Sequence, residues 1–320
     1  MRAIRFHETG GPEVLRVDDV RPPDPGENEV RVAIDLAGVN YIDIYLRTGL
    51  YDPGDLPATA GKEGAGVVEA IGEGVDQIAE GDRVAFFDAR GAYADVVVIP
   101  AERAIPVPAD LEREQAAALP LQGMTAHYLI RTIRPVDPGD RVLVHAAAGG
   151  VGHLAVQFAV RAGAEVFGTC STAEKAERVE SLGAAAIRYD EVDFVEAVLE
   201  RTDGEGVDLA IDGVGKTTFE GSVGATRTRG QVILFGQASG APDPIRPREL
   251  LGSRTLTTAS LFDYTRTREE LLERAGEVFR GATEGWLHAE IDRVLPLEEA
   301  GRAHRLLEDR KTKGKLLLEP

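Results

Sequence analysis

The stretch from Val142 to Gly152 reads VLVHAAAGGVG, and it decides the fold of the chain. An apolar, β-branched run is followed at once by small residues, three glycines and the helical pattern HLAVQFAVRAGA. This order predicts a strand, a tight turn and the beginning of a helix. Because glycine has no Cβ, the backbone of Gly149 and Gly150 can approach a bulky anion, and Gly152 lets the helix pack against the strand. An ordinary strand-to-helix turn remains the alternative for this segment alone.

The next predicted strand, Glu165 to Thr169, narrows the kind of anion. It ends in the sequence GTCSTAEK, which has no carboxylate at the tip, where sites for NAD usually hold the ribose 2′-hydroxyl with an acidic residue. The tip carries the hydroxyls of Ser171 and Thr172, and Lys175 follows about one turn into the next helix. Hydroxyls and a cation suit a 2′-phosphate, so the sequence predicts NADPH rather than NADH. The alternative for Lys175 is a solvated residue that pairs with a neighbouring glutamate.

Length and charge exclude several classes of protein. A chain of 320 residues is long enough for about two domains. It has 36 basic and 54 acidic residues, and a net charge of −18 argues against nucleic-acid binding. The lone cysteine, Cys170, permits no intramolecular disulfide and fits a reducing cytoplasm. The N-terminus lacks an apolar signal core, and no run approaches the length of a membrane span. We therefore expect a cytoplasmic protein with no membrane partner.

The pattern of residues changes near Glu112. The first third reads as short strands separated by Gly, Asp and Pro turns, which predicts a compact β-rich unit. A segment with helical spacing follows, EREQAAALPLQGMTAHYLIRTI, and Pro120 is expected to interrupt it. From Asp140 onward, strand candidates alternate with helices: RVLVHAAA, EVFGTC, AAIRYD, VDLAIDGVG, QVILFGQ and TLTTASLF. This alternation predicts an α/β protein with a parallel, doubly wound sheet of about six strands.

After Tyr264 the chain returns to a mixed pattern. An amphipathic helix is expected to begin at Thr267, with Glu270 completing a capping box. The last residues predict a strand, a helix and a final strand, and these tail strands can complete the N-terminal β-rich unit.

Motifs along the whole chain carry a family likeness. They include FHETGGPEVL, GVNYIDIYLRTGLY, GKEGAGVVEAIGEGV, GAYAD, LQGMTAHYL, HAAAGGVG, GTCSTAEK, FGQASG and GKLLL. With them the chain resembles the medium-chain dehydrogenase/reductase superfamily and, within it, the zeta-crystallin-like quinone oxidoreductases. The resemblance implies a GroES-like catalytic domain from residues 1–122 and 264–320, a Rossmann domain at 123–263, and an active site in the cleft. It also implies NADPH and usually a homodimer, for which TLTTASLF is the candidate edge strand.

The resemblance also bears on metal binding. Zinc alcohol dehydrogenases of the superfamily have a ligand Cys where this chain has Asn40, and a ligand His where it has Lys62. Zinc needs three or four Cys, His or carboxylate ligands, and one Cys with six scattered His is a poor supply. His145 lies in a strand pattern, where a buried core histidine is expected. We therefore expect no metal.

By resemblance, several residues line the cleft beside the nicotinamide. Asn40 can hydrogen-bond the substrate or the cofactor amide, and Tyr45 can offer a hydroxyl to a developing oxyanion or contact the cofactor. Asp43 is expected to hold the loop by local hydrogen bonds. Tyr51 is a further candidate, and packing at the domain boundary is the alternative for both tyrosines. Lys62 is either a proton donor or charge stabiliser, or it forms a structural ion pair with Glu63, the role we favour.

Further residues are expected around the cofactor, by resemblance or because they follow strand ends, where ligands bind in doubly wound sheets. Thr125 is expected near the nicotinamide. The residues expected at the pyrophosphate turn are Gly149, Gly150 and Val151, and those expected around the adenosine phosphate are Ser171, Lys175 and Tyr189. The later strand ends contribute Gly213, Val214, Gly215, Phe235, Gly236 and Gln237, and the tail contributes Arg310 and Lys315. Arg310 and Lys315 could equally be surface cations that answer the acidic excess.

Three functions compete at this point. Without a Lewis acid, quinones and alkenes conjugated to a carbonyl are the favoured hydride acceptors, because they spread the incoming charge. A reductase of enoyl thioesters such as enoyl-CoA is the second hypothesis, although the N-terminal part has no evident cluster of cations for coenzyme A phosphates. The third is a crystallin-like structural or RNA-binding protein with secondary reductase activity. The negative charge argues against RNA, and the full cofactor signature argues against a purely structural role.

Overall fold

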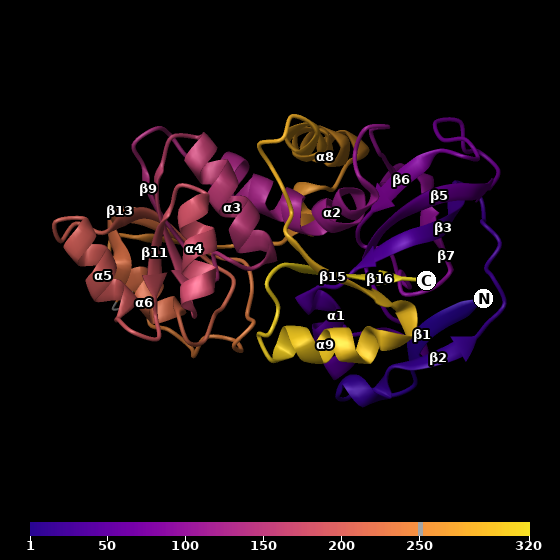
Figure 1. The fold of residues 1–320 in the computed structure, drawn as a ribbon, viewed down its shortest axis with the longest axis horizontal. Helices are drawn as coiled ribbons and strands as arrows, with labels where there is room; N and C mark the ends of the chain where they lie inside the picture. Colours follow the sequence, from indigo (N-terminus) through magenta and orange to yellow (C-terminus); the bar gives the residue numbers. More distant parts are fainter. Residues whose placement is uncertain (249–251) are drawn as a thin grey trace. The chain divides into compact units, whose positions relative to one another are not determined.

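The structure of the protein is a computed structural model, and it describes residues 1–248 and 252–320. The chain divides into two compact units, which are described separately. The first unit contains residues 1–122 and 265–320, and the second contains residues 123–264. Tyr264, expected in the first unit, belongs to the second, where its ring stacks on that of Tyr128 with 4.5 Å between centroids. Figure 1 colours the chain along its sequence.

The first unit is built from both ends of the chain. Its strands are β1 (Arg2–Phe6), β2 (Arg16–Asp19), β3 (Glu29–Gly38), β4 (Ala58–Thr59), β5 (Glu63–Ile71), β6 (Arg83–Phe86), β7 (Val96–Pro100), β8 (Ile105–Pro106), β15 (Ile291–Pro296) and β16 (Lys315–Glu319). Its helices are α1 (Tyr41–Thr48), α8 (Arg268–Thr283) and α9 (Ala300–Glu308), with short 3-10 turns η1 (Pro12–Val14), η2 (Ala101–Arg103) and η5 (Leu297–Glu299). Helix α8 begins with the predicted capping box of Thr267 and Glu270.

The tail strands complete the β-rich unit, as the sequence predicted. The larger sheet of the first unit has the order β15-β16-β3-β5-β6-β8, and β7 also pairs with β3. Strand β16 runs antiparallel to β3, with Leu317 opposite Gly38 and Leu318 opposite Ala37. A smaller sheet has the order β2-β1-β4. The last strand of the chain therefore lies next to a strand formed by residues 29–38.

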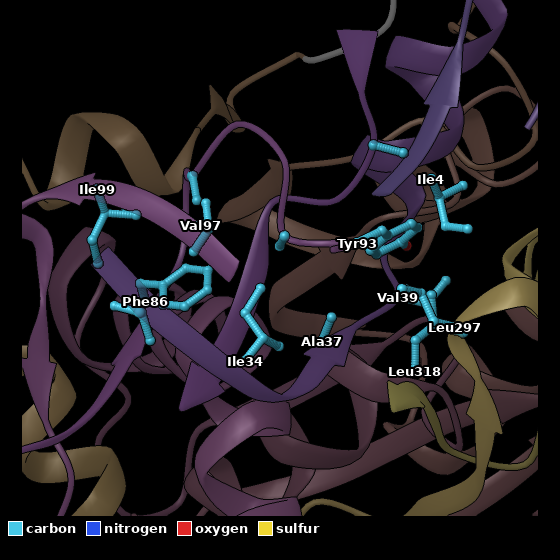
Figure 2. Packing of buried hydrophobic residues seen from close by; sticks show 14 of the residues in the cluster. Ile4, Ile34, Ala37, Val39, Phe86, Tyr93, Val97, Ile99, Leu297 and Leu318 are labelled. Atoms are coloured by element: carbon cyan, nitrogen blue, oxygen red, sulfur yellow. The ribbon is translucent and has the colours of Figure 1, made fainter. Parts of the chain in front are cut away.

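Alternating apolar residues of these strands fill the core of the first unit. In Figure 2, side chains of β6 and β7 lie together at one end of this cluster, and Leu297 and Leu318 from the C-terminal segment lie near Val39 and Tyr93 at the other. Tyr93 is fully buried, so its hydroxyl must find partners inside the protein. This core supports one side of the polar cluster described below.

The second unit is an alternation of strands and helices. Its strands are β9 (Arg141–Val144), β10 (Glu165–Cys170), β11 (Ala185–Arg188), β12 (Val207–Asp212), β13 (Thr226–Leu234) and β14 (Thr255–Thr258). Its helices are α3 (Gly150–Arg161), α4 (Ala173–Ser181), α5 (Phe194–Arg201) and α6 (Phe219–Ala225), with the short turns η3 (Leu129–Ile133) and η4 (Leu261–Tyr264). In Figure 1 these elements run from magenta to orange.

All strand pairs of this six-stranded sheet are parallel, in the order β11-β10-β9-β12-β13-β14. This is the doubly wound order that the strand and helix alternation predicted. Because crossovers between parallel strands are right-handed, the reversal of direction after β11 places α5 and α6 on one face, where they pack against each other. The order reverses between β9 and β12, and strand β14 ends the sheet, as expected for TLTTASLF.

Helix α2 (Arg113–Tyr128) continues through Pro120, where the sequence predicted an interruption. No helix in residues 1–248 and 252–320 is both long and apolar enough to cross a membrane.

Candidate functional site

The turn from β9 into α3 is built around close backbone contacts. Gly149 is the N-cap of α3 and offers no side-chain cap, so the first N–H groups of the helix are left for another acceptor. A methyl group at Gly152 would overlap the carbonyl oxygen of Ala146, so this position requires glycine. Ala146 itself has φ 50°, a left-handed conformation that alanine seldom adopts. The turn with Gly150 and Val151 forms a cradle that fits a pyrophosphate at a helix N-terminus.

The tips of β10 and β11 lie side by side. The two strands pair in parallel with Cys170 opposite Arg188, so Ser171 and Tyr189 follow neighbouring strand ends. The Thr172 hydroxyl accepts a hydrogen bond from the Lys175 N–H at 3.2 Å, which makes Thr172 the N-cap of α4. Thr172 is therefore used in capping. Ser171 and Lys175 are half-buried and Tyr189 is exposed, so the group predicted for a 2′-phosphate is brought together at one edge of the sheet.

The tips of β12 and β13 are packed tightly against each other. Methyl groups added at Gly213 or Gly236 would come within 2.6 Å of the Phe235 ring and 2.8 Å of the Gly213 carbonyl oxygen, respectively. The Phe235 N–H donates to the carbonyl oxygen of Asp212 at 3.0 Å. Val214 and Gln237 follow these strand ends and are half-buried. Since all six strands are parallel, these tips share the carboxyl edge of the sheet with the β9–α3 turn and with Ser171.

In the first unit, α1 presents the predicted tyrosines. Its C-cap Gly49 has φ 78°, and the chain turns back so that the Tyr51 N–H donates to the Tyr45 carbonyl oxygen at 3.0 Å. The rings of Tyr45 and Tyr51 lie 5.2 Å apart, and the ring of Tyr41 lies 6.1 Å from Tyr45. Tyr51 is 43% exposed. The three rings form an aromatic surface, at one end of which the Tyr41 hydroxyl donates to the Leu307 carbonyl oxygen at 3.1 Å.

Asn40 lies at the centre of a buried polar cluster. Its Oδ1 accepts hydrogen bonds from Lys315 Nζ at 2.7 Å and from Gln122 Nε2 at 3.2 Å. Its Nδ2 donates to Glu63 Oε2 at 2.8 Å and to the Gly38 carbonyl oxygen at 3.3 Å. An asparagine amide has two donor hydrogens and two acceptor lone pairs, so every position is taken. A direct contact of Asn40 with substrate or cofactor would require one of these bonds to break.

Glu63 and Lys315 form a fully buried ion pair in this cluster. Lys315 Nζ lies 2.6 Å from Glu63 Oε2, and the side chains are 1% and 0% exposed. Lys315 was expected near the cofactor or at the surface, and the structure places it inside the first unit. It holds Asn40 and Glu63 in place, so the alternative of a surface cation is wrong, and a position near the cofactor stays a prediction.

Glu63 also explains how α2 continues through a proline. Pro120 lacks an N–H and its ring distorts the preceding turn, which loosens the regular bonding of the helix. The Leu121 N–H donates to Glu63 Oε1 at 2.6 Å. The carboxylate thus holds the helix at its irregular turn, and for this reason the predicted interruption does not end the helix. Thr125, expected near the nicotinamide, lies one turn further along α2 and is 6% exposed.

Asp43 is a second buried carboxyl group of this region. Its Oδ2 accepts from the Asn40 N–H at 2.8 Å and from the Tyr93 hydroxyl at 2.9 Å, whereas its Oδ1 has no hydrogen-bond partner among the described residues. Burial raises the pKa of Asp43 to about 7 and also raises that of Tyr93. The local hydrogen bond expected of Asp43 is present in another form, because the carboxylate accepts from the N–H three residues earlier, as the N3 residue of α1. Beyond Tyr93, His304 Nε2 lies 3.3 Å from the hydroxyl, and burial beside Arg47 lowers the pKa of His304 to about 3.

The prediction favoured for Lys62, an ion pair with Glu63, is wrong. Lys62 Nζ donates to Asp88 Oδ1 at 2.6 Å, and Glu63 is paired with Lys315. Neighbouring residues at the beginning of a strand point to opposite sides, so Lys62 and Glu63 cannot share a partner surface. Arg310, the other tail residue of the prediction, is exposed and has φ 57°.

The residues of this region do not fit a zinc ion. In the part of the chain that the structure describes, His, Cys, Asp and Glu form no group of three that could hold a metal. At the two positions compared with zinc ligands, the Asn40 oxygen is bonded to an ammonium group and Lys62 is itself a cation. A metal would have to displace Lys315 from a buried site.

Sequence reasoning missed Glu63, Gln122, Tyr93 and His304 as members of the cluster. The burial of Lys315 could have been predicted from the sequence, because this lysine begins the apolar strand KLLLE. For the others, nothing local in the sequence indicates that they meet.

Comparisons with known proteins agree with this architecture. Residues 26–109 match the family described as alcohol dehydrogenase GroES-like domain, and residues 150–277 match the family described as zinc-binding dehydrogenase. The chain is 43% identical to quinone oxidoreductase 1 of Escherichia coli, over 99% of each protein, and 41% identical to 2-haloacrylate reductase of Burkholderia, over 99% of this chain and 98% of that protein. The crystal structure of Escherichia coli quinone oxidoreductase complexed with NADPH matches with a TM-score of 0.97 at 42% identity, covering all of both chains.

Proposed function

This chain belongs to the quinone oxidoreductase family, and from that premise we infer that it is an NADPH-dependent reductase of quinones or other electron-poor unsaturated compounds. The observation that carries the inference is the carboxyl edge of the second unit. There the cradle of Gly149 to Gly152 and the tips with Ser171, Lys175 and Tyr189 offer helix N–H groups, a hydroxyl and a cation. A relative of 42% identity was crystallised with NADPH, which supports the same cofactor here.

The proposed roles of the second unit follow from its chemistry. The N-terminus of α3 binds the pyrophosphate, and Ser171 and Lys175 bind the 2′-phosphate, with the Tyr189 ring beside the adenosine. When bound, NADPH supplies the hydride. Gly213, Val214, Phe235, Gly236 and Gln237 bound the rest of the cofactor site at the later strand ends.

The aromatic surface of the first unit suits a flat, conjugated acceptor. We assign Tyr45 and Tyr51 to contact with the acceptor, where a hydroxyl can donate to the oxygen on which negative charge develops. Asn40 then acts as a positioning residue, since its amide is fully used within the cluster. Lys62 remains a candidate proton donor or charge stabiliser, although its pairing with Asp88 favours a structural role.

A titration of cofactors tests the first part of the proposal. NADPH is expected to raise the melting temperature of the protein more than NADH does at the same concentration. Lys175→Ala should weaken NADPH binding about tenfold or more and leave NADH binding unchanged, because only NADPH carries the 2′-phosphate. Arg201→Ala removes an exposed cation at the far end of α5 and should change neither. Equal stabilisation by the two cofactors would contradict the proposal.

A panel of acceptors tests the second part. NADPH oxidation should be fast with a quinone or with a conjugated enone or acrylate, in keeping with the 2-haloacrylate reductase among the relatives. Crotonyl-CoA represents the enoyl-thioester alternative, and preference for it over the free acceptors would favour that function. Incubation with a metal chelator should leave the rate unchanged, since the described donor set does not fit zinc.

We also propose that the protein is a homodimer without nucleic-acid partners. Strand β14 ends its sheet with Thr255, Leu256, Thr257 and Thr258, and no strand among residues 1–248 and 252–320 pairs with its outer edge, so this edge can join the same edge of a second copy across a two-fold axis. Light scattering should give twice the mass of the 34.3 kDa chain. A monomer at micromolar concentration would refute the dimer.

A further inference from the structure

A buried chain of hydrogen bonds lies beneath the carboxyl edge of the second unit. His145, which follows β9, reaches Thr169 Oγ1 through Nδ1 at 3.0 Å and Ser222 Oγ through Nε2 at 3.0 Å. Ser222 Oγ in turn lies 2.6 Å from Asp212 Oδ2. All four residues are at most 4% exposed. The chain therefore crosses from β10 past β9 to β12, the place where the strand order reverses.

The direction of these bonds is fixed by what each group can donate. A carboxylate only accepts, so the Ser222 hydroxyl donates to Asp212, and its oxygen must accept from His145 Nε2. Burial lowers the pKa of His145, which keeps the imidazole neutral, so Nδ1 has no hydrogen and accepts from the Thr169 hydroxyl. The Thr169 oxygen accepts the Ala146 N–H at 3.2 Å. One imidazole thus connects a run of bonds that all point from Ala146 toward Asp212.

Each end of this chain of hydrogen bonds is bonded to one of the two turns that we assign to cofactor binding. At one end, the Ala146 N–H and the Ala147 N–H are bound by the side chain and the backbone of Thr169, which fixes the left-handed Ala146 beneath Gly149. At the other end, Asp212 Oδ1 accepts from the N–H groups of Val214 at 2.9 Å and Gly215 at 3.0 Å.

We propose that His145 is a positioning residue that couples the β9–α3 turn to the β12–α6 turn, so that both turns are preorganised together for the dinucleotide. This inference rests on the proposed function of the carboxyl edge. A buried histidine needs hydrogen-bond partners for its ring nitrogens in any role, and here those partners are side chains that lead to the two ligand turns.

A matched pair of substitutions tests whether this chain of hydrogen bonds supports NADPH binding. Thr169→Val and Thr202→Val are the same change at buried threonines of this unit, and each hydroxyl accepts one backbone N–H. Thr202 lies between α5 and β12, at the opposite edge of the sheet. Both variants should lower the melting temperature to a similar extent. Only Thr169→Val should raise the dissociation constant for NADPH, by about tenfold, as for other groups that support a ligand-binding residue.

A second comparison isolates the coupling through His145. Ser222→Ala breaks the chain on its far side and should weaken NADPH binding about tenfold in the otherwise unchanged protein and in the Thr202→Val background. In the Thr169→Val background it should add less than about twofold, because the chain is already broken. If Thr169→Val does not fold, His145→Gln replaces it, since a glutamine amide reaches the place of Nε2 but leaves Thr169 without its partner.

The outcomes separate this inference from the proposed function. Equal NADPH affinities of Thr169→Val and Thr202→Val, or additive effects of Ser222→Ala in the Thr169→Val background, would overturn the role of His145 while NADPH binding by the parent protein upholds the function. If the parent protein does not bind NADPH, both fall.

Discussion

Glu63 in the first unit and Asp212 in the second are both fully buried carboxylates, yet they are stabilised in different ways. Glu63 is held by the Lys315 ammonium, an amide and one backbone N–H. Asp212 is held by neutral donors, namely two backbone N–H groups and the hydroxyls of Thr218 and Ser222. The negative charge of Glu63 is balanced by the positive charge of Lys315, whereas that of Asp212 is stabilised by four hydrogen bonds from neutral groups. The loss of a single partner should therefore matter more at Glu63.

Asp43 shows what happens when neither solution is complete. One of its oxygens accepts two hydrogen bonds, whereas the other has no partner among the described residues. Burial then dominates and raises its pKa to about 7. The number and charge of its donors therefore decide how far burial can raise the pKa of a carboxyl group.

The largest effect is expected from Lys315→Met, which removes the ammonium group that is bonded to Glu63. An uncompensated buried charge costs about 3–5 kcal/mol, so the free energy of unfolding of the first unit should fall by that amount. Trp286 is the only tryptophan and lies in this unit, so denaturant unfolding followed by its fluorescence reports the change. Lys315→Met combined with Glu63→Gln should recover much of the loss, and a double variant as unstable as Lys315→Met would contradict this account.

The next largest effect concerns pH. The Asp43 pKa is about 7 in the folded protein and about 4 when unfolded, so between these values only the unfolded chain ionises. The contribution of Asp43 to the free energy of unfolding should therefore fall as pH rises from about 4 to about 7, and then level off. Asp43→Asn should remove about 2–3 kcal/mol of the decline between pH 5 and pH 8. Asp76→Asn, an exposed control in the same unit, should leave the profile unchanged, and an unaltered slope in Asp43→Asn would refute the assignment.

His304 contributes with the opposite sign over an overlapping range of pH, so the contributions of His304 and Asp43 to the free energy of unfolding offset each other between about pH 4 and pH 6.5. Its pKa is about 3 in the folded protein, and an unfolded histidine takes up its proton below about pH 6.5. Stability from this group is therefore present above about pH 6.5 and is lost as pH falls toward 3. His304→Gln should flatten this acid limb, as measured by the same fluorescence titration, while leaving the decline due to Asp43 in place.

A smaller effect is expected from Asp212→Asn. Three of its donors can still be accepted by the amide oxygen, and the Ser222 hydroxyl can turn to the Thr218 carbonyl oxygen, 3.0 Å away. We expect a loss of about 1–2 kcal/mol, measured by circular dichroism during denaturation. A loss as large as that of Lys315→Met would break the distinction between the two carboxylates.

The smallest effect is expected from Lys62→Met, which is the matched control for Lys315→Met. Its partner Asp88 is 38% exposed, so solvent screens the pair and the expected change is below about 1 kcal/mol. Tryptophan fluorescence during unfolding should show curves for this variant and the parent that nearly coincide. Equal costs for the two lysines would show that burial is not what distinguishes them.

The sequence predicted the second unit better than the buried cluster of the first. Glycines, β-branched runs and strand tips act over a few residues, so VLVHAAAGGVG was enough to predict the strand, the turn and the helix that follow β9. The parallel order of the sheet and the burial of His145 are confirmed. The partners of His145 were not predicted, because Thr169 and Ser222 meet it only across neighbouring elements.

The cluster around Asn40 depends on a pairing that no local pattern shows. Asn40 and Lys315 are 275 residues apart, and only the pairing of β16 with β3 brings them together. The sequence predicted that the tail strands complete the unit, but the register that places Lys315 on Glu63 was outside its reach. For the same reason Lys62, which is adjacent to Glu63 in sequence, was assigned the wrong partner.

The pairing of β16 with β3 also has a consequence for biosynthesis. Glu63 leaves the ribosome 252 residues before Lys315, which at about 5–20 residues per second is a delay of roughly 13 to 50 seconds. During that time β3 lacks its C-terminal neighbour and a carboxylate destined for the interior has no counter-charge. The second unit, whose strands are contiguous in sequence, can fold while the first waits. The strands of the first unit that are made first thus cannot be completed until the last residues of the chain have been made.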